Sequence, residues 1–400
     1  MNLPIPSSKP STTPSNAKFS NIFETLPVNR AAEMLRYGQD KPNVITIAQG
    51  EGSKATPEFI TNAAFVAAKE GKTFYTPPLG IPELRSSLSN YYQRIYGFNI
   101  PDNRIFVTAS GTAAVHLALA SIIEDGDEVI AITPIWKNLL GAISVARGRV
   151  TEVSLTCENN QWSLDMDKLF DSVSEKTKAI MLVTPSNPTG WVMNDDEIKQ
   201  IVEFARARDI WIIADEVYGR MVYNGQHAPS FLSHTNDDDK VFVVNSFSKA
   251  WSMTGWRMGW LVGPSCAEEK IRDLAIYNYM APTSFSQFGA IAALEHGEEH
   301  LKSNLALWRR NRQAFIDTLS KYNSIQCPIP EATFYGFFKV EKEPNCFKFT
   351  KRLIDDAGVS LAPGFTFGHD FKGWMRICFA VSEEIMDEAL IRLEKGISGI

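Results

Sequence analysis

Five short, continuously apolar runs recur through the middle of the chain, and each one ends in a cluster of polar residues. The runs are RIFVTA (104–109), DEVIAI (127–132), AIMLV (179–183), WIIAD (211–215) and VFVVN (241–245). Apolar runs that do not alternate are typical of strands covered on both faces, as in parallel sheets. Segments with helical spacing of apolar residues lie between the runs, for example at 195–209. This alternation predicts an α/β fold with a doubly wound, mostly parallel sheet and helices on both sides.

The polar clusters follow the carboxyl ends of the predicted strands. They read SGT after 109, TPIW after 132, TPSNPTG after 183, EVYG after 215 and SFSK after 245. In open α/β sheets, ligands bind in the crevice beyond the carboxyl ends of the strands. The clusters are therefore expected to meet at one ligand site.

The chain length of 400 residues is enough for two domains. After about Glu295 the pattern changes to a long amphipathic segment (301–322) and shorter apolar runs, which predicts a smaller α+β domain. The first twenty residues are rich in Ser, Thr and Pro, and they predict a loose N-terminal arm.

The composition argues against several partners. A formal net charge of −6 provides no broad cationic surface, so neither nucleic acid nor an anionic membrane is an expected partner. No run approaches the roughly 18 apolar residues of a membrane span. The five cysteines are widely spaced and show no CxxC pairing, which favours neither disulfides nor a metal site. A cytoplasmic location is expected.

The cluster after Asn245 carries the strongest chemical signal. Ser246 and Ser248 come three residues and one residue before Lys249, and Arg257 follows eight residues after the lysine. A solvated loop would explain a lone lysine at a strand end. Hydroxyls and a guanidinium together suit a phosphate dianion, and a lysine amine that loses its proton easily is a nucleophile toward carbonyl groups. The group therefore indicates a phosphorylated aldehyde as ligand.

Two further clusters fit such a ligand. The residues Ser110, Gly111 and Thr112 open a helix directly after a strand, where backbone N–H groups favour an anion, although a turn and a cap would look the same. Asp215 ends an unusually apolar strand. It is either the cap of a following helix or a buried acceptor that holds a proton on a heterocyclic nitrogen. Tyr218 follows closely enough to reach the same ring.

The chain resembles the class I and II pyridoxal-phosphate aminotransferases of fold type I, which are similar to aspartate aminotransferase. The most specific match is SFSKAWSMTGWRMGW (246–260), and PSNPTG (185–190) and DEVY (215–218) occur in the expected order. The resemblance extends from about residue 28 to the end. It implies a large cofactor domain with a mostly parallel seven-stranded sheet at 51–289, a small domain formed by 24–50 with 290–400, and a flexible arm at 1–23.

The resemblance implies catalytic roles for three residues. Lys249 is expected to bond to the aldehyde of pyridoxal 5'-phosphate as a Schiff base and to act as the base, as this cofactor requires. Asp215 would keep the pyridine nitrogen protonated. Tyr218 and Asn187 would bind the ring hydroxyl, and Asn187 would also face the substrate.

The resemblance also implies how the phosphate, the ring and the substrate are held. The residues expected at the phosphate are Ser110, Gly111, Thr112, Ser246, Ser248 and Arg257. Trp136 would stack on the ring, and Tyr75 would reach the phosphate of a neighbouring subunit, so that an active homodimer is expected. Arg376 would bind the substrate carboxylate, helped by the backbone of Gly50. Near Gly50 the chain departs from the family pattern, since Ala48 and Gly52 replace a glycine and a proline.

The implied activity is transfer of an amino group between an L-amino acid and a 2-oxo acid by a ping-pong mechanism. A pyridoxal-phosphate lyase that eliminates a β- or γ-substituent would use the same residues and is the alternative. A DNA-binding regulator would need a helix-turn-helix before the sensor, for which the N-terminal arm is too short. A nicotinamide dehydrogenase would need a GxGxxG turn, which the chain lacks.

The substrate side chain stays open at this level. Lys137, beside Trp136, is either a second cation for an acidic substrate or an exposed loop lysine. Aromatic or broad specificity is the other option, because several aromatic residues fall in segments that border the pocket in relatives. These are Phe285, Phe334, Tyr335 and Phe365.

Overall fold

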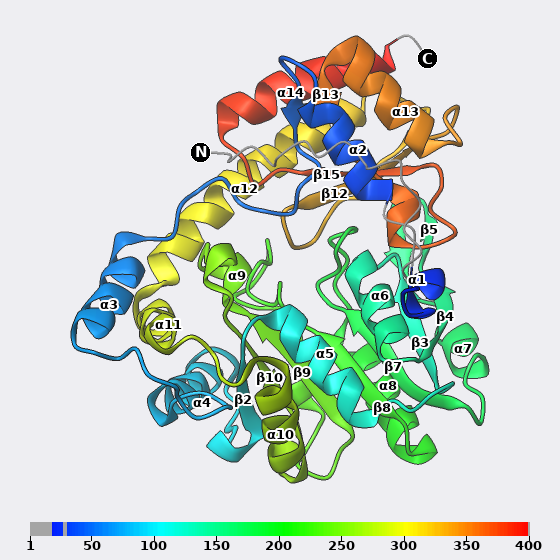
Figure 1. Ribbon diagram of the computed structural model, residues 1–400. Coiled ribbons are helices and arrows are strands. Elements are labelled where there is room, and N and C mark those ends of the chain that lie inside the picture. Colours follow the sequence, from blue (N-terminus) through cyan, green and yellow to red (C-terminus); the bar gives the residue numbers. More distant parts are fainter. Residues whose placement is uncertain (1–17, 27–29, 399–400) are drawn as a thin grey trace.

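A seven-stranded sheet forms the centre of the computed structural model, which describes residues 18–26 and 30–398 (Figure 1). The strands in spatial order are β2 (Ile105–Thr108), β10 (Gly259–Val262), β9 (Val241–Ser246), β8 (Trp211–Asp215), β7 (Thr177–Val183), β3 (Glu128–Thr133) and β4 (Arg149–Ser154). Only the two pairs that involve β10 are antiparallel. The predicted mostly parallel sheet is confirmed, and each of the five apolar runs forms one of its strands.

Two strands of this sheet were missing from the five predicted runs. β4 lies at the edge of the sheet and is half-exposed along most of its length, so its sequence RVTEVS carries polar residues. β10 is only four residues long and is buried. It runs back between β2 and β9 after the Lys249 loop, and this antiparallel return has no signal in the local pattern.

Helices cover both faces of the large sheet, as predicted. The main ones are α4 (Pro82–Tyr96), α5 (Gly111–Ile122), α6 (Lys137–Val145), α7 (Met166–Asp171), α8 (Asp195–Arg208) and α10 (Glu268–Tyr279). α5 and α6 connect strands in one direction across the sheet, whereas α7 and α8 connect them in the opposite direction. Because parallel crossovers are right-handed, these two pairs lie on opposite faces.

The helix predicted at 195–209 shows how local sequence sets its ends. Asn194 and Glu197 form a capping box, in which each side chain accepts a hydrogen bond from the other residue's backbone N–H. Ile198, Ile201, Val202 and Ala205 face the core. The helix stops at Asp209, which takes a left-handed conformation.

A smaller α+β layer lies above the large sheet in Figure 1. Its four-stranded sheet has the order β11 (Ile325–Gln326), β12 (Tyr335–Val340), β15 (Trp374–Cys378) and β14 (Ala362–Pro363). Its helices are α2 (Arg30–Gln39), α13 (Cys346–Arg352), the π-helical turn Leu353–Ala357 and α14 (Glu383–Ile397). The helix predicted within 301–322 is α12 (Glu298–Leu319).

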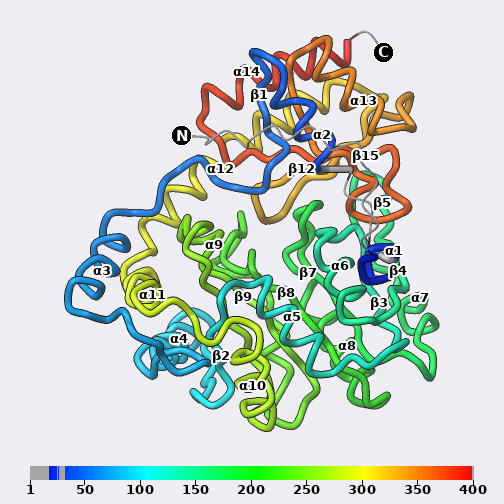
Figure 2. Tube along the Cα trace, viewed as in Figure 1, coloured from blue at the N-terminus to red at the C-terminus, as the bar shows by residue number. Residues whose placement is uncertain are grey.

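An early and a late segment of the chain pair in this layer. β1 (Ile45–Thr46) pairs in parallel with β13 (Val359–Ser360), and the trace in Figure 2 shows the early and late parts of the chain side by side. α12 runs from the neighbourhood of α3 (Glu58–Lys69) and α11 (Ser284–His296) up to this layer (Figure 2). It therefore connects the two layers physically.

Apart from single 3₁₀ turns, the remaining short elements are α1 (Ile22–Thr25), α9 (Phe247–Ala250) and the hairpin of β5 (Thr156–Glu158) and β6 (Gln161–Ser163). Residues 1–17 of the predicted N-terminal arm (1–23) lie outside the described residues.

Candidate active site

The carboxyl ends of three adjacent strands bring the predicted polar clusters together. Asp215, the last residue of β8, pairs in register with Val183 at the end of β7 and with Val244 of β9. Thus Asp215, the segment that follows β7 and the Ser246–Lys249 segment that follows β9 lie at one edge of the sheet. The expected meeting of the clusters is observed.

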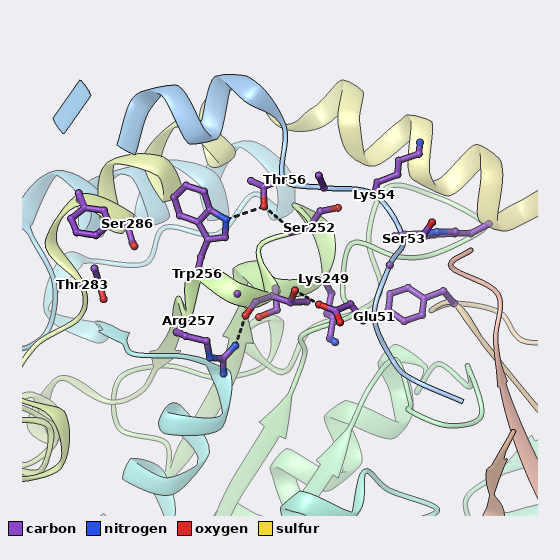
Figure 3. Close-up of a pocket in the computed structure, with 18 residues that line it drawn as sticks. Glu51, Ser53, Lys54, Thr56, Lys249, Ser252, Trp256, Arg257, Thr283 and Ser286 are labelled. Atoms are coloured by element: carbon purple, nitrogen blue, oxygen red, sulfur yellow. Dashed lines mark hydrogen bonds between the residues drawn. The ribbon is translucent and has the colours of Figure 1, made fainter. Parts of the chain in front are cut away.

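A cavity of about 450 Å³ opens at this edge, and we call it the sheet-edge cavity. Its lining includes all but two of the predicted site residues: Gly50, Gly111, Thr112, Trp136, Asn187, Asp215, Tyr218, Ser246, Ser248, Lys249, Arg257 and Arg376. The exceptions are Ser110 and Tyr75. An adjoining cavity of about 700 Å³ shares Ser248, Lys249, Thr254 and Arg257 with it (Figure 3).

Lys249 presents its amine to both cavities. Removal of this amine from water lowers the pKa of Lys249 to about 8. Its Nζ donates a hydrogen bond of 2.6 Å to the carbonyl oxygen of Gly50 and lies 6.0 Å from the centre of the Phe334 ring. An amine with this pKa is uncharged in a useful fraction of molecules near neutral pH, as a nucleophile or base requires.

Asp215 lines the same cavity, and its pKa is shifted in the direction opposite to that of Lys249. Its side chain is 7% exposed, and burial raises the pKa of Asp215 to about 6. The Val217 N–H donates a 3.0 Å hydrogen bond to Oδ1, and this bond and nearby Lys249 lower the pKa only in part. A cationic N–H group placed beside this carboxyl would relieve the cost of its burial.

Donor groups for an anion surround another wall of the sheet-edge cavity. Gly111 and Thr112 are the first residues of α5, so their N–H groups have no partner within the helix. The Ser246 hydroxyl caps α9, accepts from the Ser248 N–H at 3.1 Å and donates to the Ser248 hydroxyl at 3.0 Å. Arg257 completes this wall. The set has the chemistry of a phosphate cradle.

Two details explain how the backbone forms this wall. Gly259 of β10 passes so close to the start of α5 that a Cβ at this position would collide with the backbone of Ser110 and Gly111. Ser110 itself accepts a 3.0 Å hydrogen bond from the Ala113 N–H. The Ser110 hydroxyl therefore caps α5 and does not line the cavity.

Arg376 lies at the opposite wall, on β15 of the smaller layer. Its Nη1 donates to Asn187 Oδ1 at 2.8 Å, and its Nη2 donates to the Ala48 carbonyl at 2.6 Å. Its guanidinium stacks 4.4 Å from the centre of the Tyr335 ring. The buried Nε has no hydrogen-bond partner among the described residues. The guanidinium is thus fixed in place and still has capacity for a carboxylate.

Tyr335 is a central residue of the site. From the sequence it was expected only to border the pocket. Its hydroxyl lies 2.9 Å from that of Tyr218, and Asn187 Nδ2 donates to Tyr218 Oη at 3.5 Å. A Cβ on Gly50 would collide with the Tyr335 hydroxyl. Asn138 also lines the cavity and was not predicted. Its position two residues after Trp136 was the only sequence signal for it.

The other specificity candidates are dispersed. Phe285 and Phe334 line the adjoining cavity. Lys137 and Phe365 line a third cavity, of about 930 Å³, beside α6, and burial lowers the pKa of Lys137. Lys137 therefore does not reach the sheet-edge cavity in this structure.

Tyr75 lies away from both cavities, with 87% of its surface exposed. Within a single chain it makes no contribution to the site.

The strand order of the large sheet, with β10 as the antiparallel strand beside β2, places the protein in the fold type I class of α/β transferases. Within this class the chain belongs to the class I and II aminotransferase family, whose sequence profile, described as "Aminotransferase class I and II", matches residues 42–393.

Relatives of known sequence support this assignment. The chain is 34% identical over 390 residues to a probable aspartate/prephenate aminotransferase of Aquifex aeolicus, covering 94% of this chain and 96% of the relative. It is 30% identical over 388 residues to aromatic-amino-acid aminotransferase 2 of Thermococcus litoralis, with 94% and 97% coverage.

Solved structures agree. An alanine aminotransferase from Pyrococcus furiosus matches with a TM-score of 0.90 and 28% identity over 96% of this chain and 100% of the other. An aspartate aminotransferase from Thermotoga maritima matches with a TM-score of 0.87 and 29% identity, covering 95% and 100%. The protein is therefore an aminotransferase, and the lyase alternative is not favoured.

In the part of the chain that the structure describes, no helix combines the length and the apolar character needed to cross a membrane.

Proposed function

We propose that the sheet-edge cavity binds pyridoxal 5'-phosphate and that the protein uses it to move an amino group between an L-amino acid and a 2-oxo acid in a ping-pong mechanism. The observation that carries this proposal is the pairing of Lys249, with a lowered pKa, and Asp215, with a raised pKa, in one cavity. The family assignment implies the same cofactor. When bound, this cofactor supplies an aldehyde for the amino group and a ring that withdraws electrons.

The donor set fits each part of that cofactor. The helix N-terminus at Gly111 and Thr112, with Ser246, Ser248 and Arg257, would hold the phosphate. The buried carboxyl of Asp215 would hold a proton on the ring nitrogen, and Tyr218 and Asn187 would donate to the ring hydroxyl. Trp136 lines the same cavity and would stack on the ring.

Arg376 and Lys249 would have different roles in transamination. Arg376 would bind the substrate carboxylate and so orient the bond between Cα and hydrogen. Lys249 would accept the proton from the substrate Cα, because its amine is uncharged in part near neutral pH. The donor then leaves as its 2-oxo acid before the acceptor binds.

The test of the proposal uses protein loaded with the cofactor. Reduction with sodium borohydride followed by mass spectrometry should place the cofactor mass on the peptide that contains Lys249. Addition of single amino acids should then change the cofactor absorbance, and the panel would rank acidic against aromatic donors. A protein that binds no cofactor, or that carries it on another lysine, would overturn the proposal.

The Arg376→Lys variant is expected to raise KM for every amino acid by about 10- to 100-fold. A lysine offers a point charge in place of the planar fork that reaches Asn187, Ala48 and a carboxylate together. Steady-state kinetics with two donors of different side chain checks this. A rise in KM for one donor only would assign Arg376 to the side chain instead of the carboxylate.

We propose that the active form is a homodimer. Large apolar side chains are exposed on α3, on and just after α10, on α11 and on the 72–76 loop: Phe65, Val66, Phe74, Tyr75, Ile276, Tyr277, Met280 and Phe285. Hydrogen bonds from Ser284 to the Lys72 carbonyl and from Gln287 to the Thr76 hydroxyl hold this loop beside α11. An exposed group of this kind marks an interaction surface. A second copy that covers it would bring Tyr75 to the neighbouring phosphate.

A mixture of two inactive variants tests the shared site. Lys249→Ala and Tyr75→Ala, refolded or co-expressed in equal amounts, should recover about one quarter of the wild-type turnover, because half of the dimers are mixed and each has one intact site. Each variant alone, and a mixture of Lys249→Ala with Asp215→Asn, whose two changes lie in the site of one chain, are the controls. Absence of recovery in dimers confirmed by sedimentation would show that Tyr75 serves its own subunit or none.

Two further expectations stand as proposals. The division into a large domain at 51–289 and a small domain at 24–50 with 290–400 is supported by the two separate sheets. A cytoplasmic location is supported by the five cysteines, all within the described residues and all free.

A further inference from the structure

The loop that carries Lys249 and Arg257 contains two residues in the left-handed backbone region. Ser252 has φ of 54° and Arg257 has φ of 53°. A residue with a Cβ takes this conformation only where surrounding contacts hold it. The contacts that hold this loop therefore decide where Arg257 lies.

Two side chains outside the loop, Thr56 and His300, provide these contacts. The Thr56 hydroxyl donates to the Ser252 carbonyl at 2.6 Å and accepts from Trp256 Nε1 at 2.9 Å (Figure 3). The Ser252 hydroxyl lies 2.9 Å from His300 Nε2, and Asn304 Nδ2 lies 3.0 Å from the same nitrogen. We call Thr56, Ser252 and His300 the loop clamp.

The loop clamp joins three segments that are distant in sequence. Thr56 comes from the segment that crosses between the two layers, and His300 comes from the first turn of α12, which continues into the smaller layer. Ser252 belongs to the loop itself. Trp256, held by Thr56, immediately precedes Arg257, and Ser252 lies three residues after Lys249. The clamp thus holds the loop at Ser252 and at Trp256, which both line the adjoining cavity.

His300 is suited to be an acceptor in this arrangement. Burial, with Lys54 nearby, lowers the pKa of His300, so its ring stays neutral near physiological pH. A neutral ring protonated at Nδ1 presents a lone pair on Nε2 to the Ser252 hydroxyl and the Asn304 amide. Lys54 itself donates to the Ser303 hydroxyl at 3.1 Å.

We propose that Thr56, Ser252 and His300 are positioning residues that hold the strained loop. They keep Arg257 in the wall of the sheet-edge cavity that would bind the phosphate. This inference rests on the proposed function, since it assigns Arg257 to an anion. None of the three touches the reacting atoms in this assignment. They act through Arg257, and their loss should weaken anion binding more than it slows the chemical step.

The test begins with Thr56→Val, which keeps the shape of the side chain and removes both hydrogen bonds of the hydroxyl. In cofactor-free protein, calorimetry with inorganic phosphate should give a Kd raised by about tenfold, as expected for the loss of two ordinary hydrogen bonds. The Kd of the cofactor should rise in parallel, whereas kcat at saturating cofactor should stay within about twofold of wild type.

Three further variants separate positioning from general damage. Thr56→Ser keeps the hydroxyl and should restore wild-type phosphate binding. Thr61→Val is the matched control, because the Thr61 hydroxyl bonds only to its own helix at Glu58. Ser252→Gly removes the contact with His300, and glycine adopts the left-handed backbone conformation without strain. The variant should therefore fold, but it should bind phosphate less tightly than wild type.

The outcomes distinguish this inference from the proposed function. If wild type binds phosphate and the cofactor but Thr56→Val and Ser252→Gly bind them equally well, the loop clamp has no positioning role. If wild-type protein binds neither, the proposed function fails, and the inference falls with it. A loss of kcat with unchanged affinities would also overturn the inference.

Discussion

The Lys249→Ala variant is expected to lose at least about 10⁴-fold in turnover with every amino acid, because it removes the residue proposed as both nucleophile and base. Among the described residues, Lys249 is the only lysine that lines the sheet-edge cavity, so none of them offers a substitute amine there. Lys137 points into a different cavity. Turnover is measured with cofactor in excess, so that weaker cofactor binding does not mimic a chemical defect.

The control for this variant is Lys240→Ala. Lys240 pairs with Asp209 at the far end of the sheet and lines neither cavity of the site. It should retain wild-type turnover within about twofold, since exposed ion pairs contribute little. Lys249→Ala that keeps normal turnover, or that still yields a borohydride-fixed cofactor on the protein, would refute the assignment.

The Asp215→Asn variant is expected to lose about 10³-fold in turnover while the cofactor stays bound. An amide has nearly the shape of the carboxyl but carries no charge with which to hold a proton on the ring nitrogen. The residues proposed to hold the phosphate, Gly111, Thr112, Ser246 and Arg257, are untouched, so cofactor affinity should change little. Single-turnover absorbance measurements separate the slowed chemical step from binding.

The neighbouring carboxyl provides a matched control. Glu216 is also buried, but it accepts hydrogen bonds from the Ser230 hydroxyl at 2.7 Å and the Phe231 N–H at 2.8 Å and lines neither cavity. Glu216→Gln should therefore lower the unfolding temperature and keep turnover within about threefold. Equal losses of turnover in Asp215→Asn and Glu216→Gln would show that buried charge at this strand end matters only for folding.

Asp215 also predicts a pH dependence that needs no substrate. Its pKa rises from an ordinary value of 3.8 to about 6 in the folded chain, so the folded state binds the proton more tightly than the unfolded state. The contribution of Asp215 to the free energy of unfolding is thus largest at low pH and is lost as the pH rises through 6. Thermal unfolding of cofactor-free wild type and Asp215→Asn over this range should diverge accordingly.

Much of the fold could be read from local pattern. The five apolar runs became strands because they are buried on both faces, and the helix at 195–208 begins and ends where Asn194 and Asp209 set its caps. β4 and β10 were not predicted, because their environments differ from those of the five buried parallel strands. β4 is a half-exposed edge strand, and β10 is a short antiparallel strand. The local pattern of apolar and polar residues reflects how a strand is buried, and an exposed edge strand and a very short strand both give weak patterns.

The site was predictable to the extent that its residues follow strand ends. Asp215, Ser246 and Lys249 needed only the rule that strand ends converge. Arg376 and Gly50 needed the resemblance to a family, because they come from the smaller layer. Tyr335 was expected only to border the pocket and Asn138 was not assigned, since an aromatic or an amide in a core segment carries no distinguishing signal until its partners are known.

The amino-acid sequence by itself determined which strands form the centre of the sheet and which polar residues lie at their ends, because these depend on interactions between residues near one another in the chain. Only the tertiary structure decided that Arg376 meets Asn187 and Ala48, that Lys137 turns away, and that Thr56 and His300 hold Ser252. Those contacts join residues far apart in sequence. Their geometry is set by how the two layers pack, which no local pattern encodes.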